Sequence, residues 1–162
     1  MKVTINQRGT TCNVYLPASD KEEITDERTQ TGEVLKGAET ILIVDDEEMI
    51  IDVGNAALKS MGYQVLSARS GEEAIKVYKE NKDRIDMVIL DMIMPDVGGQ
   101  EVFDTMKEIN SDVKVLLSSG YSIDGQAGEI LERGCNAFLQ KPFSMKELSQ
   151  KIRDVLDDDQ GQ

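Results

Sequence analysis

The sequence contains no histidine at all. This absence excludes a histidine nucleophile, a histidine general base and most zinc sites within the polypeptide. Any chemistry that needs an imidazole must therefore draw it from outside this sequence.

Cysteine is also scarce, with only Cys12 and Cys135 in the chain. The two residues lie far apart and have no metal-ligating neighbours, so the sequence indicates neither a disulfide framework nor a metal-binding motif. We interpret both as reduced thiols that act as small apolar residues, which is typical of a cytosolic protein.

Positive charge is in short supply, since 18 Lys and Arg residues stand against 31 Asp and Glu residues for a formal net charge of -13. This excess of negative charge argues against electrostatic binding to nucleic acid or to an anionic membrane over a large surface. No apolar run approaches the roughly 20 residues needed to span a bilayer, and Met1–Leu16 lacks the apolar centre of a signal peptide. We therefore expect a cytoplasmic chain with no direct nucleic-acid or membrane contact.

The length of 162 residues suits one domain with a short additional segment. Val3–Asn6 and Thr11–Leu16 are rich in β-branched residues and predict two strands or a hairpin within residues 1–17. Residues 18–38 are polar and charged, which predicts a flexible acidic linker. The domain is expected at 39–157, followed by a tail at 158–162.

Beyond the linker, short apolar runs alternate with amphipathic stretches, as in βαβ units with a parallel sheet. The predicted strands are Thr40–Val44, Gln64–Ser67, Asp86–Leu90, Val113–Leu117 and Ala137–Leu139. Right-handed crossovers then predict an open five-stranded α/β sheet with helices on both faces.

Three of the predicted helices have clear signals. The first, from about Glu47 to Met61, carries Ile50, Val53, Ala57 and Met61 on one face and ends before Gly62. Two others begin with predicted capping boxes, Ser70 to Glu73 and Ser144 to Glu147.

Polar residues follow four of the five predicted strands. Because open parallel sheets place their sites beyond the carboxyl ends of the strands, these side chains are expected to lie at one edge. They are Asp45, Asp46, Asp91, Ser118, Ser119 and Lys141. An Asp-Asp pair alone would more often be a helix N-cap, but the convergence of the whole set favours a functional site.

Three neighbouring carboxylates repel one another unless a cation or protonation relieves the charge. Mg²⁺, or Mn²⁺, is the expected ion, because hard cations prefer oxygen ligands. Asp46 and Asp91 are candidate direct ligands, Asp45 a ligand through water, and the Ile93 backbone carbonyl a further oxygen donor.

With the charge neutralised, the Asp91 carboxylate is able to attack phosphorus and form an acyl phosphate. Lys141 supplies a compact positive charge for the phosphoryl oxygens, and Ser119 supplies a hydroxyl. The residues thus predict phosphoryl transfer to Asp91.

Several ordered motifs carry a resemblance to a known family. They are Ile41–Glu47, Asp91–Pro95, Gly98-Gly99, Ser119-Gly120 and Lys141–Phe143, and with them residues 39–157 resemble the receiver domains of bacterial response regulators in two-component signalling. The resemblance implies a flavodoxin-like, doubly wound (βα)5 three-layer sandwich with strand order 2-1-3-4-5. It also implies phosphorylation of Asp91 by a phosphohistidine donor, either a kinase domain or a histidine phosphotransfer protein.

The same resemblance assigns further roles. Ser119 moves toward the phosphoryl group, and Phe138 occupies the position of an aromatic switch, although a core aromatic on an edge strand is an equally good interpretation of Phe138. The Lys141–Pro142 bond is expected to be cis. Gly98 and Gly99 are expected to allow unusual backbone angles after Asp91.

The first 17 residues carry a second, weaker resemblance. Gly9–Thr11 and Cys12–Pro17 look like the last strands of a histidine kinase ATP-binding domain, which suggests the C-terminal receiver of a hybrid sensor histidine kinase. The ATP-binding motifs and the phosphorylated histidine of such a kinase are missing, so this chain is not expected to be an enzyme. An unrelated N-terminal arm is the alternative.

Two other functions remain open at this point. An aspartyl-phosphate phosphohydrolase usually has a second acid two residues after the nucleophile, where this sequence has Ile93, and a passive flavodoxin-like binding module needs no phosphorylation. Within the receiver interpretation, Ile93 and Tyr121 flank the hydrolytic water and are poorly suited to orienting it, which predicts a long-lived phosphorylated state. We expect a monomer or weak dimer.

Overall fold

The computed structural model describes residues 2–6, 9–13, 33–95, 97–120, 130–131 and 133–158, the first two ranges by their backbone. The chain divides into two compact units, Met1–Thr31 and Gly32–Gln162. In the first unit, β1 (Lys2–Asn6) and β2 (Gly9–Asn13) pair antiparallel as the expected hairpin. Val14–Pro17, most of the predicted linker and residues 159–162 lie outside the described residues.

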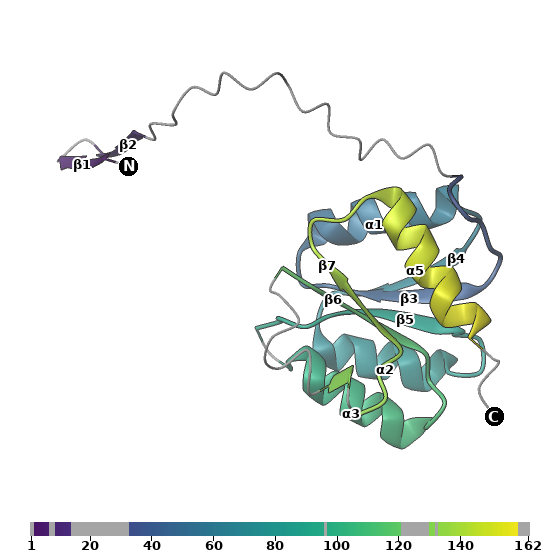
Figure 1. The fold of residues 1–162 in the computed structure, drawn as a ribbon. Helices are drawn as coiled ribbons and strands as arrows, with labels where there is room; N and C mark the ends of the chain where they lie inside the picture. Colours follow the sequence, from purple (N-terminus) through teal and green to yellow (C-terminus); the bar gives the residue numbers. More distant parts are fainter. Residues whose placement is uncertain are drawn as a thin grey trace. The chain divides into compact units, whose positions relative to one another are not determined.

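The second unit is built on a five-stranded sheet of order β4-β3-β5-β6-β7, in which every neighbouring pair is parallel (Figure 1). Its strands are β3 (Thr40–Val44), β4 (Gln64–Ala68), β5 (Met87–Asp91), β6 (Val115–Ser119) and β7 (Ala137–Gln140). Numbered within this sheet, the order is 2-1-3-4-5, so the predicted topology is confirmed.

Helices cover both faces of the sheet (Figure 1). They are α1 (Glu48–Ser60) and α5 (Met145–Asp157) on one face, and α2 (Gly71–Asn81) and α3 (Gly99–Ile109) on the other. The three-layer, flavodoxin-like α/β sandwich is therefore confirmed. Within the described part of the chain, none of these helices has the length and apolarity that a membrane crossing would need.

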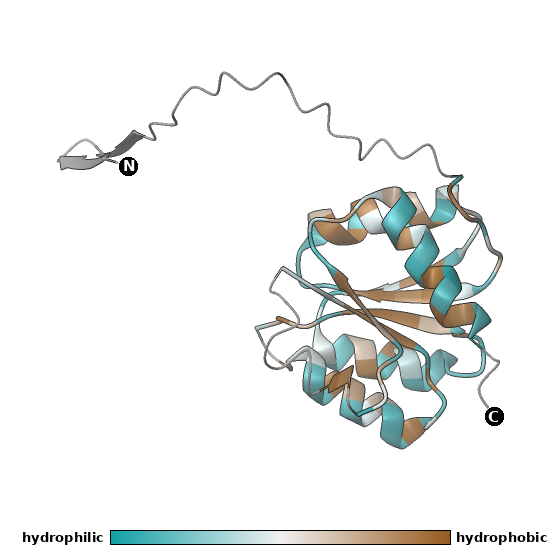
Figure 2. Cartoon of the chain, in the orientation of Figure 1, coloured by the Kyte–Doolittle hydropathy of each residue, from teal (hydrophilic) through white to brown (hydrophobic). Residues whose placement is uncertain are grey.

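The strand sequences are apolar on both faces because each face packs against helices. In β3, Leu42 and Val44 join the core under α2 and α3, whereas Ile41 and Ile43 join the core under α1 and α5. Figure 2 shows the resulting band of hydrophobic strands between helices whose outer surfaces are hydrophilic. Full burial of each such side chain stabilises the fold by about 1.5–3 kcal/mol.

Local signals at the helix starts are only partly as predicted. The capping box of α5 is complete, since Ser144 and Glu147 satisfy one another's backbone amides. At α2, Ser70 Oγ accepts from the Glu73 amide, but the Glu73 carboxylate accepts from the Arg69 amide at 2.7 Å. The predicted capping box is therefore only half correct, because the Glu73 side chain caps the amide of Arg69 and not that of Ser70.

The fourth strand of the sheet was predicted two residues too early. The amide of Val113 closes a turn on the Asn110 carbonyl, so the ladder begins only at Val115, opposite Val88. The strand ends at Ser119, so Ser118 and Ser119 are part of the sheet and do not follow it.

The apolar face predicted for α1 is largely wrong, because, of Ile50, Val53, Ala57 and Met61, only Met61, at the C-terminal cap, is buried. Its buried side chains are Ile51 and Leu58, while Val53 is 65% exposed. Gly54 faces β3 so closely that a Cβ atom there would lie 2.3 Å from Ile43 Cδ1. This face of α1 therefore lines a surface groove and is only partly core.

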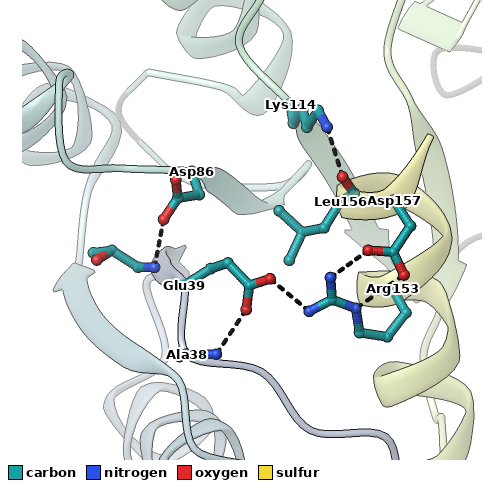
Figure 3. Close-up of polar contacts among 8 residues, drawn as sticks. Ala38, Glu39, Asp86, Lys114, Arg153, Leu156 and Asp157 are labelled. Atoms are coloured by element: carbon teal, nitrogen blue, oxygen red, sulfur yellow. Dashed lines mark hydrogen bonds and ion pairs between the residues drawn. The ribbon is translucent and has the colours of Figure 1, made fainter. Parts of the chain in front are cut away.

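Residues 33–39, which we call the leading segment, run directly into β3 and pack against α5 and the end of α1. Val34 contacts the core under α1 and α5, and the Glu39 carboxylate pairs with Arg153 of α5 (Figure 3). Residues 33–38 were predicted as the end of the flexible linker. The structure shows instead that this stretch packs against the domain, which its polar sequence does not indicate.

Candidate functional site

The site lies where β3, β5, β6 and β7 end, which places its side chains at one edge of the sheet. Asp45 follows β3, Asp91 is the last residue of β5, Ser119 is the last residue of β6, and Lys141 follows β7. The sheet thus brings together residues that are separated by up to 96 positions in sequence.

Lys141 is the centre of the arrangement. Its Nζ lies 2.7 Å from Asp45 Oδ2 and 2.8 Å from Asp91 Oδ1, so one ammonium joins both carboxylates. The Lys141 amide also donates to the Ser119 carbonyl at 2.7 Å, and the Lys141–Pro142 peptide bond is cis. The backbone therefore holds the lysine beside β6 while its side chain reaches across to β5 and β3.

Backbone amides satisfy the remaining carboxylate oxygens. Asp91 Oδ2 accepts from the Ile93 amide at 2.9 Å, and Asp45 Oδ1 accepts from the Glu47 amide at 3.0 Å. Asp45 and Asp91 are only 3% and 7% exposed. Both carboxylates are consequently fixed in orientation.

Burial and the ion pairs of Lys141 have opposite effects on the pKa values of Asp91 and Lys141. Burial raises the pKa of Asp91 above its ordinary value, with a further contribution from the Asp45 charge, against the lowering effect of Lys141 and the Ile93 amide. Burial opposes the charge on Lys141, but its hydrogen bonds and ion pairs with Asp45 and Asp91 outweigh burial and raise its pKa. Lys141 therefore remains an ammonium at neutral pH.

Asp46 is placed differently from its neighbours, because its side chain is exposed. Within the described residues, no three Asp, Glu, Cys or His side chains converge closely enough to hold a metal by themselves. The structure thus joins Asp45 and Asp91 through Lys141 but leaves the Asp46 side chain exposed to solvent.

The donor set nevertheless fits a magnesium ion. Three carboxylates against one ammonium leave a formal charge of -2, which a divalent cation would neutralise. Mg²⁺ commonly binds through one or two carboxylates together with waters and phosphate oxygens, so a complete protein cage is unnecessary. Asp46, Asp91 and the Ile93 carbonyl are the groups that would hold it directly, with Asp45 behind them.

Ser119 and Phe138 lie on neighbouring strands, as the aromatic-switch interpretation requires. Ser119 is buried at the end of β6, and Phe138, in β7, is half-buried against the core under α2 and α3. Both interpretations of Phe138, switch and core residue, fit this position. Tyr121, the second residue named for phosphate lifetime, lies outside the described residues.

Gly98 and Gly99 do not have the role that was expected. Gly98 has φ -65°, and among the described glycines only Gly62 and Gly134 have positive φ. A Cβ atom at Gly99, however, would lie 2.5 Å from the Asp91 carbonyl oxygen. Gly99 is therefore required for close approach of α3 to the end of β5, not for an unusual backbone angle.

Sequence reasoning missed the direct ion pair between Lys141 and Asp45 and the groove beside it. The placement of both residues at the same edge was the available signal for the pair. The groove is lined by Ile50, Val53, Gly54, Phe143, Met145 and Lys141, among others. A glycine inside a helix is the signal that could have indicated it.

Comparisons with known proteins agree with this geometry. Residues 41–153 match the family model of the response regulator receiver domain. The chain is 31% identical to the sensor kinase CckA of Brucella abortus over 93% of this chain and 17% of that protein. It is 36% identical to a probable transcriptional regulator, ycf27, of Porphyridium aerugineum over 73% of this chain and 48% of that protein. The chain thus spans half or less of these relatives.

Solved structures give the same result. A receiver domain protein from Clostridium thermocellum superposes with a TM-score of 0.71 at 30% identity, covering 74% of this chain and 94% of that one. The response regulator TrrA of Thermotoga maritima, solved in complex with Mg²⁺ and beryllium fluoride, gives 0.66 at 31% identity over 73% and 99%. With its parallel sheet, its buried Asp91 and these matches, the chain belongs to the response regulator receiver domain family.

Proposed function

We propose that this receiver domain accepts a phosphoryl group on Asp91 from a phosphohistidine of another domain or protein. The observation that carries the proposal is the double ion pair of Lys141, which places an ammonium 2.8 Å from the carboxylate that would react. A buried Asp held between a lysine and a backbone amide has the fixed geometry that nucleophilic attack requires.

In the proposed step, an oxygen of the Asp91 carboxylate forms a bond to phosphorus as the phosphorus–nitrogen bond of the donor breaks. The imidazole nitrogen keeps the electron pair of that bond and takes up a proton. Lys141 then pairs with a phosphoryl oxygen, and the Ser119 hydroxyl is the candidate donor to another. Bound Mg²⁺ would supply charge neutralisation between the carboxylates and the incoming phosphoryl group.

The donor has to touch the surface around Asp91, because its histidine must come within bonding distance. Among the described residues, the exposed large hydrophobic side chains are Met49 and Val53 of α1, Ile93 after β5 and Met145 of α5. Of these, Val53 and Met145 line the groove described above together with Lys141, which contacts Asp91. We therefore propose that the partner is a histidine-bearing helical domain that covers this groove.

The match to CckA supports an origin in a hybrid kinase. A match over 93% of the chain has to extend upstream of the receiver domain, which alone accounts for residues 41–153. We propose that the first unit is the end of a kinase ATP-binding domain. The chain itself would act as a substrate of phosphotransfer and not as a turnover enzyme, since Ile93 stands where a phosphohydrolase needs its second acid.

The experiment is intact-mass measurement after incubation with Mg²⁺ and acetyl phosphate. Wild type should gain about 80 Da, the mass of one phosphoryl group, and Asp91→Asn should gain nothing. Asp104→Asn is the matched control, because Asp104 lies in a surface ion pair with Arg133. Phosphorylation that survives Asp91→Asn would reject Asp91 as the acceptor, and release of free phosphate over many turnovers would favour a phosphohydrolase.

A further inference from the structure

The leading segment is attached to α5 and to the end of α1 by its own backbone. The Leu35 amide donates to Ser149 Oγ at 3.3 Å, and the Gly37 amide donates to the Met61 carbonyl at 3.1 Å. These two hydrogen bonds hold a stretch of chain that precedes the first strand of the sheet.

Ser149 is a polar residue on the buried side of α5. It is fully buried, and its hydroxyl donates to the Lys146 carbonyl at 2.8 Å while accepting from Leu35. A buried hydroxyl is stable only when its hydrogen bonds are made. The leading segment therefore supplies one of the hydrogen bonds of the buried Ser149 hydroxyl.

The segment also packs without spare room. A Cβ atom at Gly37 would lie 2.3 Å from Tyr63 Cε1 and 2.7 Å from Arg153 Nη1. At Gly62, which has φ +98°, a Cβ atom would lie 2.5 Å from the Gly37 carbonyl oxygen. Two glycines thus allow the segment to lie directly against the turn between α1 and β4.

An ion pair completes the attachment (Figure 3). Arg153 Nη1 lies 2.7 Å from Glu39 Oε1, and the same guanidinium binds Asp157 one turn later in α5. The Glu39 carbonyl accepts from the Gln64 amide at 3.0 Å, which fixes the residue to β4 as well.

The two ends of β3 are therefore each joined to the chain around α5. At the end near the site, Asp45 pairs with Lys141, which precedes α5 by a short turn. At the other end, Glu39 pairs with Arg153 of α5 itself. The buried strand Thr40–Val44 connects the two pairs. The two pairs are thus connected through a buried strand and a packed helix, which is the kind of contiguous path that energetic coupling needs.

We propose that the leading segment is a mechanical link that reports the state of Lys141 to the chain preceding residue 33. The inference rests on the proposed function. When Lys141 pairs with a phosphoryl group in place of Asp45, the turn into α5 shifts against β3. The leading segment, held to both elements, is then released.

Hydrogen exchange at the Leu35 and Gly37 amides tests the link in the full chain. Lys141→Met should speed exchange at both amides by between about twofold and thirtyfold. The matched control is Lys151→Met, which removes a lysine of α5 itself and should change neither rate. The Leu42 amide of β3 serves as internal reference, because a general loss of stability would speed it equally. Arg153→Gln removes the ion pair to Glu39. Faster exchange at both amides in this variant would establish that they report release of the segment.

A second arm uses wild type treated with acetyl phosphate and Mg²⁺, with phosphorylation read by intact mass in the same sample. Faster exchange at Leu35 and Gly37 in the phosphorylated chain, absent in treated Asp91→Asn, supports the link. A phosphorylated chain with unchanged rates overturns the link and leaves the proposed function intact. If no phosphoryl group is gained, the proposed function fails and Lys141→Met decides the link: unchanged rates in that variant also overturn it.

Discussion

Lys141 Nζ lies 2.7 Å from Asp45 Oδ2 and holds this buried carboxylate to the phosphoacceptor candidate Asp91. The lysine thereby acts as a built-in counter-ion for two carboxylates that would otherwise repel each other. Because one side chain performs this task, the effect of removing Lys141 can be compared with the effect of adding Mg²⁺ to the variant that lacks it.

Lys141→Met should lower the stability of the metal-free chain by about 1–3 kcal/mol, because two buried carboxylates lose a charged hydrogen-bond donor. Mg²⁺ should restore part of the loss. The measurement is thermal unfolding with and without Mg²⁺, and Lys151→Met is the control. A variant as stable as wild type without Mg²⁺ would contradict the role of Lys141 as counter-ion.

Asp91→Asn should raise the stability of the metal-free chain at neutral pH. Burial raises the folded-state pKa of Asp91, so the folded chain binds this proton more tightly than the unfolded chain. Stability from this group is therefore present below the unfolded-state pKa and is lost as pH rises through the folded-state pKa. The advantage of the Asn variant should shrink as pH falls toward the ordinary Asp range. Unfolding midpoints from neutral to acid pH measure it, and an advantage that grows toward acid would reject the sign.

Gly99→Ala should destabilise the fold by about 1–3 kcal/mol and impair phosphorylation, because the added Cβ would press on the Asp91 carbonyl at 2.5 Å. Gly98→Ala is a matched control at the next position, where a Cβ atom has nothing within 4 Å. Urea unfolding of both variants makes the comparison. Equal effects at the two glycines would show that close approach of the backbone is not the reason for Gly99.

The phosphorylated state should be long-lived for a receiver. Ile93 is 55% exposed beside Asp91 and has no group able to orient an attacking water. Ile93→Gln should shorten the lifetime, which mass spectrometry follows after removal of the phosphodonor. A wild-type half-life of only seconds would contradict the prediction.

Met49 and Val53 should contribute little to folding, because they are 75% and 65% exposed. The double variant Met49→Lys, Val53→Lys is therefore expected to keep the unfolding midpoint and the acetyl phosphate reaction of wild type, since surface changes usually stay within about 0.5 kcal/mol. A large fall in the midpoint would show that Met49 and Val53 stabilise the fold and would weaken the assignment of this surface to partner docking.

Much of the fold could be predicted because its signals are local. The unbroken apolar runs Ile41–Val44 and Met87–Leu90 indicate strands buried on both faces, and alternation with helices indicates a parallel sheet. The strand-end rule then placed Asp45, Asp91, Ser119 and Lys141 at one edge. Boundaries were less certain: β6 starts at Val115 because a turn at Val113 competes with the ladder.

The sequence by itself determined which residue types stand at the strand ends, and with them the class of chemistry. Only the tertiary structure decided how those residues are paired. The bridge from Lys141 to Asp45 spans 96 positions, and the anchoring of Glu39 by Arg153 spans 114. Neither contact has a local signal, because both depend on how β3, α1 and α5 pack against one another. The same packing decides that Gly99 is needed for space and that Val53 remains exposed.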